Sequence, residues 1–240
     1  MNHDANPFAE MIEHPSPKGR SAQLPSWPLA PTHAGLAALA CWAGFALVSA
    51  MVLGGWSGSI DEAGLLFWRG GALLLPRGPV WLLEAVRDVT ALGGVVLRSA
   101  FALAGVLALW RLARAAEARA LALSIITGWA VEFALKLLVG RDRPVIVPHL
   151  TEAGGASFPS GHSFNAALVY LSLALAFAAL SPSRAARAAL IAAALALSFA
   201  IALSRVWLGV HFPTDALAGW LGGSAWAFTA AAIAHRRAMP

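Results

Sequence analysis

The chain has 240 residues, of which 59% are hydrophobic and 12% are charged. A soluble globular domain is about half apolar and about a quarter charged, so this composition excludes an ordinary soluble domain and indicates an integral membrane protein. The net charge of +5 does not indicate nucleic-acid binding, because the sequence has no basic face with interleaved aromatic residues.

The first 33 residues are polar and rich in proline, and we expect them to form a flexible cytoplasmic tail. Residues 34–237 are expected to form a single transmembrane domain, because no second block of soluble composition follows. The first apolar run, residues 34–53, is long enough to cross a hydrocarbon core about 30 Å thick as a helix. The single cysteine, Cys41, lies in this run and excludes an internal disulfide.

Residues 55–92 mix tryptophans with charged residues, a pattern typical of helices that lie in the membrane interface. Five further apolar runs predict spanning helices, at residues 94–112, 119–139, 163–181, 187–203 and 216–234. We expect the spans to be helical because a helix satisfies all its backbone polar groups internally within the bilayer. The predicted fold class is therefore all-α, a polytopic membrane protein with about six transmembrane helices and extracytoplasmic interfacial helices.

Basic residues gather in the tail and in the connectors on one side of the predicted spans. They are Lys18, Arg20, Arg111, Arg114, Arg119, Arg184, Arg187, Arg236 and Arg237. By the positive-inside rule, these residues and both termini face the cytoplasm. Segments 55–92, 140–162 and 204–215 are then expected on the extracytoplasmic face of a multi-pass protein of the cell (cytoplasmic or inner) membrane.

Three polar segments stand at helix ends on that expected extracytoplasmic face. Their chemistry-bearing residues are Lys136, Arg143, Ser160, Gly161, His162, Arg205, His211 and Asp215. Three permanent cations suit a multiply charged anion, and the guanidinium forks of Arg143 and Arg205 match phosphate oxygens. Ser160 and Gly161 precede an apolar helix and would present a hydroxyl and free backbone N–H groups to the same anion.

The two histidines in these segments divide the remaining chemistry. His211 can attack phosphorus as a neutral imidazole, and His162 can protonate the departing oxygen. Asp215 lies four residues after His211, and a bond to the far ring nitrogen would fix the tautomer of His211. A metal site is disfavoured because the cations would repel it, so we expect no metal and no cofactor.

These residues form a three-part pattern: Lys136-x6-Arg143-Pro144, Pro159-Ser160-Gly161-His162 and Ser204-Arg205-x5-His211-x3-Asp215. The pattern resembles the signature of the type 2 phosphatidic acid phosphatase superfamily, which comprises membrane lipid phosphatases and the soluble vanadium haloperoxidases. The resemblance covers about residues 85–235, and residues 88–93 are similar to a segment that precedes the second span in bacterial members.

The resemblance implies a six-helix phosphatase domain with an extracytoplasmic active site, a phosphohistidine intermediate and no metal requirement. The family's phosphate ligands correspond to Lys136, Arg143, Ser160, Gly161 and Arg205. The family pattern also makes His211 the nucleophile, Asp215 the residue that supports His211, and His162 the general acid.

The expected substrate is a lipid phosphate or pyrophosphate whose tail lies in the bilayer. Undecaprenyl pyrophosphate is preferred because the chain is compact and its site is expected to face outward. Phosphatidylglycerophosphate and phosphatidic acid are the alternatives. A more distant alternative is a lipid-phosphate carrier without catalysis, although such a carrier would not need His211. A haloperoxidase conflicts with the spans, and the sequence does not indicate an oligomeric state.

Three residues near the pattern have two interpretations each. Glu132 and Lys136 are spaced i, i+4 on one predicted helix, where they either simply neutralise each other or serve the phosphate site. Arg141 either serves the site or forms a solvated turn pair with Asp142. His149 lies in a proline-flanked loop, where it is either exposed or in contact with a substrate headgroup.

Overall fold

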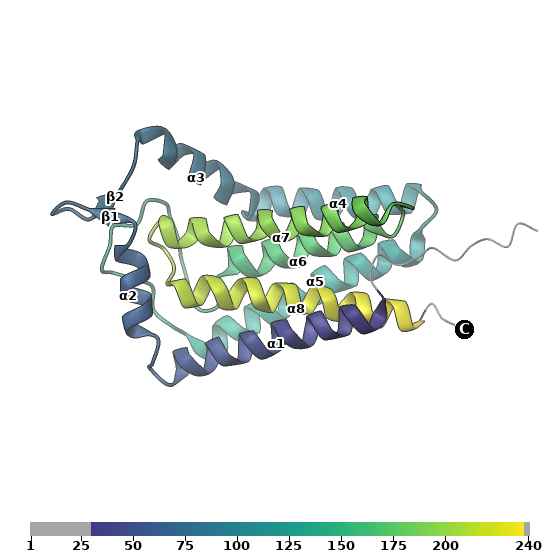
Figure 1. Ribbon diagram of the computed structural model, residues 1–240, viewed down its shortest axis with the longest axis horizontal. Coiled ribbons are helices and arrows are strands. Elements are labelled where there is room, and N and C mark those ends of the chain that lie inside the picture. Colours follow the sequence, from purple (N-terminus) through teal and green to yellow (C-terminus); the bar gives the residue numbers. More distant parts are fainter. Residues whose placement is uncertain (1–29, 238–240) are drawn as a thin grey trace, which may run out of the picture.

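The computed structural model describes residues 30–237, which contain eight helices and one short two-stranded ladder (Figure 1). The helices are α1 (Pro31–Leu53), α2 (Gly58–Leu66), α3 (Val80–Leu92), α4 (Val95–Arg111), α5 (Ala115–Val139), α6 (Gly161–Ala178), α7 (Arg184–Trp207) and α8 (Pro213–Arg237). The strands β1 (Arg69–Gly70) and β2 (Leu75–Pro76) pair antiparallel. The predicted helical fold class is confirmed. The predicted tail lies outside the described residues apart from its last four, and α1 begins at Pro31, inside the predicted tail.

Five helices, α1, α5, α6, α7 and α8, are long and apolar enough to cross a membrane. The sixth span is α4, which passes the same test together with α3, from which it is bent by 45°. The bend falls at Gly93 and Gly94, between the two helices. The six predicted spans therefore match helices of the structure, and the chain is a multi-pass membrane protein.

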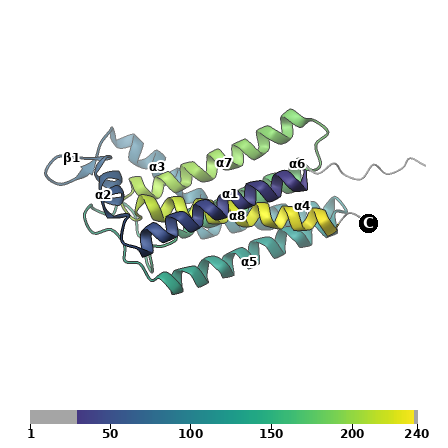
Figure 2. The same cartoon turned by 60° about the horizontal axis from the view of Figure 1, so that its bottom comes forward.

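The central helix of the bundle is α6, in which 72% of the residues of the apolar stretch are buried, against 11% in α1. It packs against α4, α5, α7 and α8, while α1 lies outside along α8. Figure 2 shows α7 and α5 on opposite sides of the α1–α8 pair. Glycines allow α8 to approach α6 closely, since a Cβ at Gly223 would lie 2.0 Å from the carbonyl oxygen of Phe164.

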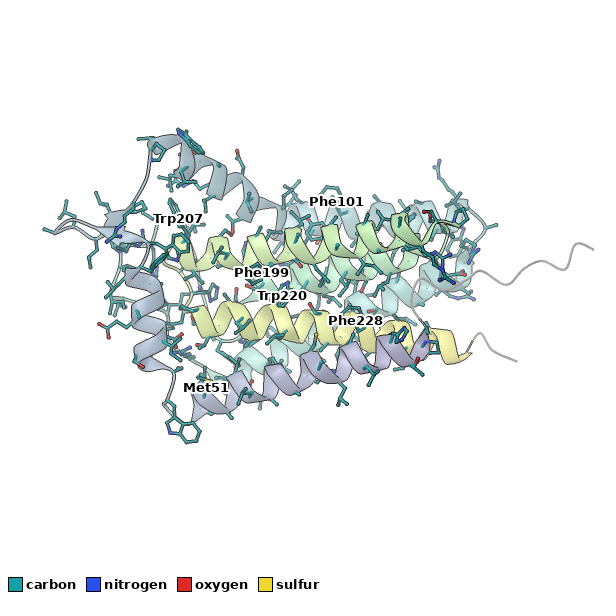
Figure 3. All side chains as sticks on the ribbon, in the orientation of Figure 1. Met51, Phe101, Phe199, Trp207, Trp220 and Phe228 are labelled. Carbon is teal, nitrogen blue, oxygen red and sulfur yellow. The ribbon has the colours of Figure 1, made fainter. Side chains whose placement is uncertain are left out.

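The elements between α1 and α4 gather at one end of the bundle, which we call the cap end. Figure 1 shows α2, the ladder and α3 at this end, with the start of α1 and the end of α8 at the other. Trp207, at the end of α7, lies between the bundle and these elements (Figure 3). It is buried in a cluster that includes Trp68 and Leu82. The cap end is therefore packed onto the connector between α7 and α8.

Candidate active site

The structure brings the three predicted polar segments together at the cap end. The segments are joined by backbone hydrogen bonds, from Ser160 N to Asp215 O (3.0 Å) and from Ser157 N to Arg141 O (2.7 Å). These bonds tie the loop between α5 and α6 to the start of α8. The predicted site residues therefore share one region, as expected from their positions at helix ends on one side of the predicted spans.

The start of α6 is shaped to receive an anion. Ser160 is the N-cap of the helix and accepts hydrogen bonds from the backbone N–H and the hydroxyl of Ser163. The backbone N–H groups of Gly161 and His162 make no hydrogen bond within the described part of the chain. Gly161 is required for space, because a Cβ there would lie 2.8 Å from Oε1 of Glu132.

His211 lies buried in the connector between α7 and α8. Its Nε2 atom is 3.0 Å from Nη1 of Arg143, and its Nδ1 atom is 3.3 Å from the hydroxyl of Ser157. An arginine can only donate, so Nε2 carries the lone pair and Nδ1 carries the proton. Burial lowers the pKa of His211 from 6.5 to about 4; Asp215 opposes this shift and Arg143 adds to it. The ring is therefore neutral at neutral pH, with its lone pair directed toward a cation.

Asp215, in the first turn of α8, is fully buried and has partners on both carboxylate oxygens. Oδ2 accepts hydrogen bonds from the hydroxyl of Ser157 (2.5 Å) and from Phe212 N (3.0 Å). Nδ1 of His211 lies 3.7 Å from Oδ2, too far for the direct bond expected from the sequence. The contact instead runs through Ser157, a residue that sequence reasoning did not assign.

Arg143 is fixed by loop carbonyls. Its Nε donates to Gly155 O (3.0 Å), its Nη2 donates to Gly154 O (2.7 Å), and its Nη1 donates to Val210 O (2.7 Å). These bonds hold the guanidinium at the edge of the His211 ring, where a phosphoryl group would meet Nε2.

The two other predicted phosphate ligands are also anchored. Arg205 is buried, donates from Nη1 to the hydroxyl of Thr90 (2.9 Å), and has a buried Nε without a hydrogen bond in the described residues. Nζ of Lys136 donates to Ala156 O (2.8 Å) and lies 3.6 Å from Oε1 of Glu132. The buried Glu132 therefore forms an ion pair with Lys136, as expected if the two residues neutralise each other.

His162 stands half-buried on the first turn of α6, against the bend between α3 and α4. A Cβ at Gly93 would lie 3.3 Å from Cδ2 of His162. The hydroxyl of Tyr170 donates to Leu92 O (2.7 Å) and fixes the bend. Residues 88–93, singled out in the sequence, therefore form one wall of the site and include Thr90, the partner of Arg205.

Two residues with open interpretations are placed by their contacts. Arg141 does not pair with Asp142; its guanidinium binds the carboxylates of Asp61 and Asp215. His149 is exposed, and its Nε2 lies 2.7 Å from Pro144 O. Within residues 30–237, no group of three or more His, Cys, Asp or Glu side chains is arranged to hold a metal ion.

Comparison with known proteins identifies a family model that matches the part of the chain containing this site. The family model described as the PAP2 superfamily matches residues 117–239, just over half of the chain. Phosphatidylglycerophosphatase B of Bacillus subtilis (strain 168) is 41% identical over 88 residues, which are 36% of this chain and 42% of that protein. The sequence match thus spans less than half the length of this curated relative.

One solved structure extends the similarity to the fold. The crystal structure described as the first transmembrane PAP2 type phosphatidylglycerolphosphate phosphatase, from Bacillus subtilis, superposes with a TM-score of 0.74 at 27% identity. The superposition covers 83% of this chain and 96% of that one. Aquifex aeolicus LpxE matches with a TM-score of 0.49 at 26% identity, over 64% of this chain and 87% of that one.

Proposed function

The chain belongs to the PAP2 superfamily, and we propose that it is a membrane lipid phosphatase that hydrolyses the phosphomonoester of a phosphatidylglycerophosphate-type lipid. The two matches from Bacillus subtilis support this substrate class, since both are described as phosphatidylglycerophosphate phosphatases. They favour it over undecaprenyl pyrophosphate, the preference from the sequence, for which the contacts described above give no separate support.

One observation carries the proposal. The neutral Nε2 of buried His211 faces the guanidinium of Arg143 at 3.0 Å. A nucleophilic nitrogen beside a fixed cation is the arrangement that phosphoryl transfer needs, because the cation draws the phosphate to the nucleophile and stabilises its charge. Lys136 and Arg205 both interact electrostatically with Arg143, and we infer that they bind the same phosphate together with the open N–H groups of α6.

In the proposed first step, Nε2 of His211 attacks phosphorus and the bond from phosphorus to the lipid oxygen breaks. His162, in its protonated form, gives a proton to the departing alkoxide, and the lipid alcohol leaves. The imidazole gains positive charge as the nitrogen–phosphorus bond forms. Asp215, acting through Ser157, stabilises that charge and holds the ring in the reactive tautomer.

In the second step, His162 accepts a proton from a water molecule, which attacks phosphorus and breaks the bond to Nε2. Inorganic phosphate leaves and His211 returns to its neutral state. Arg143, Lys136 and Arg205 hold the three nonbridging oxygens through both steps. His162 gives one proton in the first step and takes one back in the second, so the residues of the chain account for every proton moved. This route uses no metal and no cofactor.

Purified protein in detergent tests the substrate directly, by phosphate release from phosphatidylglycerophosphate, phosphatidic acid and undecaprenyl pyrophosphate. We expect kcat/KM for phosphatidylglycerophosphate to exceed the others by about tenfold or more, about 1.4 kcal/mol in transition-state binding. A preference for the pyrophosphate would overturn the substrate class but keep the reaction. Tight lipid binding without release of phosphate from any of the three would instead favour the carrier alternative.

The proposed orientation has both termini in the cytoplasm and the cap end on the outer side of the cell membrane. The basic connectors support it through the positive-inside rule. A Ser59→Cys variant in a Cys41→Ala background tests it, because Ser59 is exposed at the cap end. A membrane-impermeant maleimide should label intact spheroplasts of the producing cell at this position. Labelling only after lysis would contradict the orientation.

A further inference from the structure

A guanidinium joins the catalytic region to a helix outside the family signature. Nη1 of Arg141 donates to Oδ1 of Asp215 (2.6 Å), and Nη2 donates to Oδ2 of Asp61 (2.7 Å). Asp61 lies in α2 and is 1% exposed, and Asp215 is 0% exposed. A single side chain thus bridges two buried carboxylates that are far apart in the sequence.

Asp61 also closes the start of α8. Its Oδ1 accepts hydrogen bonds from the backbone N–H of Thr214 (3.0 Å) and from the Thr214 hydroxyl (2.8 Å). A helix N-terminus has unpaired N–H groups and partial positive charge, so a carboxylate at this place stabilises it. The cap of α8 is therefore contributed by another element, α2.

The contact between α2 and α8 leaves no space for a side chain between them. A Cβ at Gly64 would lie 2.4 Å from Cγ of Pro213, the first residue of α8. The close approach brings Asp61, one turn earlier in α2, against Thr214. The position of α2 is thus coupled to the turn of α8 that carries Asp215.

Arg141 is committed to the protein rather than open to phosphate. Nη1 also donates to the Thr214 hydroxyl (2.9 Å), Nη2 contacts the Ser57 hydroxyl (3.4 Å), and the guanidinium lies 4.2 Å from the Phe212 ring centre. Burial lowers the pKa of Arg141, but the carboxylates of Asp215 and Asp61 outweigh it and raise the pKa overall. Arg141 therefore differs from Arg143, which is bonded to carbonyl oxygens and lies beside Nε2 of His211, whereas Arg141 is neutralised by two carboxylates.

We propose that Asp61 and Arg141 form a positioning pair for the phosphoryl transfer proposed above. Asp61 fixes Arg141, Arg141 fixes the carboxylate of Asp215, and Asp215 orients His211 through the Ser157 hydroxyl. Two carboxylates against one guanidinium also leave one net negative charge behind the imidazole. That charge stabilises the positive charge that His211 gains as its nitrogen bonds to phosphorus.

Variants of the two residues separate positioning from phosphate binding. Arg141→Gln and Asp61→Asn should each lower kcat by about 10- to 100-fold, while KM and the inhibition constant of inorganic phosphate stay within about twofold. The double variant should be no worse than the poorer single variant, because both changes break one chain of contacts. Arg141→Lys keeps the charge but lacks the planar fork whose two nitrogens each reach a different carboxylate, so its kcat should fall between Arg141→Gln and the wild type.

Neighbouring exposed carboxylates offer matched controls. Glu62 follows Asp61 and Asp142 follows Arg141, and both are exposed. Glu62→Gln and Asp142→Asn should leave kcat unchanged. A tenfold rise in KM with unchanged kcat in Arg141→Gln would make Arg141 a phosphate ligand and overturn the proposal. A kcat within twofold of the wild type would overturn it as well.

A measurement without substrate keeps this inference separate from the proposed function. Nitrogen-15 NMR of histidine-labelled protein reports ring tautomers, and His211→Asn identifies the signal of His211 among the seven histidines. Because Arg143 donates to Nε2 in both proteins, each should show the Nδ1–H tautomer, but the Nδ1 resonance should shift or broaden in Arg141→Gln as Ser157 and Asp215 lose their fixed positions. An unchanged signal in a folded Arg141→Gln protein overturns the positioning pair. Failure to hydrolyse any lipid phosphate, by contrast, overturns the proposed function alone.

Discussion

The hydroxyl of Ser157 stands between Asp215 and His211, 2.5 Å from the carboxylate oxygen and 3.3 Å from Nδ1 of the ring. The carboxylate itself lies 3.7 Å from Nδ1. The orientation of the proposed nucleophile thus depends on a serine as well as on an aspartate. This relation makes the site a chain of contacts whose members can be removed one at a time.

Ser157→Ala should remove the hydroxyl that links Nδ1 of His211 to Asp215, and so leave the ring of His211 less firmly oriented. We expect kcat to fall by about 10- to 100-fold, equal to about 1.4 to 2.7 kcal/mol of transition-state stabilisation, with KM little changed. Ser59→Ala, an exposed serine at the cap end, is the control. Full activity in Ser157→Ala would show that Asp215 acts on His211 directly.

The pKa of His211 predicts the acid side of the pH profile. Because the pKa is lowered to about 4 in the folded protein, His211 stays neutral well below pH 6.5. Its contribution to the fall of kcat/KM on the acid side should therefore centre near pH 4. The comparison of kcat/KM across pH 3.5 to 8 measures this directly. An acid limb near pH 6.5, with the nitrogen-15 signal of His211 showing protonation over the same range, would contradict the buried, neutral ring.

The same pKa predicts how stability changes with pH. The unfolded chain binds the proton with a pKa near 6.5 and the folded chain with a pKa near 4, so acid favours unfolding between these values. Below about pH 4 both states are protonated and no further loss occurs. The melting temperature of the wild type, relative to His211→Asn, should therefore fall between pH 6.5 and 4. A constant difference across this range would argue against the shift.

Gly161→Ala should weaken phosphate binding. The new Cβ would lie 2.8 Å from Oε1 of Glu132 and 3.3 Å from Cε of Lys136, so the start of α6 or Lys136 has to move. We expect KM and the inhibition constant of inorganic phosphate to rise by about tenfold or more. Gly35→Ala is the control, since a Cβ there meets nothing within 4 Å. An unchanged KM would remove Gly161 from the phosphate site.

A chelator and an oxyanion test the proposed metal-free chemistry. Activity should survive millimolar EDTA, and vanadate should inhibit because it mimics pentacovalent phosphorus. The measurement is the initial rate of phosphate release before and after each addition. Loss of most of the activity in EDTA, restored by a divalent metal, would show that a metal takes part.

The spans were predictable because hydropathy over about 20 residues depends on local sequence alone. Residues of the candidate site that belong to short sequence motifs, such as Ser160 and His162, could also be predicted. The contact of Asp61 with Thr214 was not, because it joins positions 153 residues apart. A carboxylate in an amphipathic segment with exposed Glu62 beside it gives no sign that it is buried. Such pairs become visible only when the packing of α2 on α8 is known.

Detection of a covalent intermediate is the most direct test of His211 as the nucleophile. The protein is mixed with lipid substrate labelled on the phosphomonoester, quenched in base within milliseconds, digested and analysed by mass spectrometry. We expect phosphate on His211, stable in base and lost in acid, and none in His211→Ala. Label on another residue, or turnover by His211→Ala at the rate of the wild type, would contradict it.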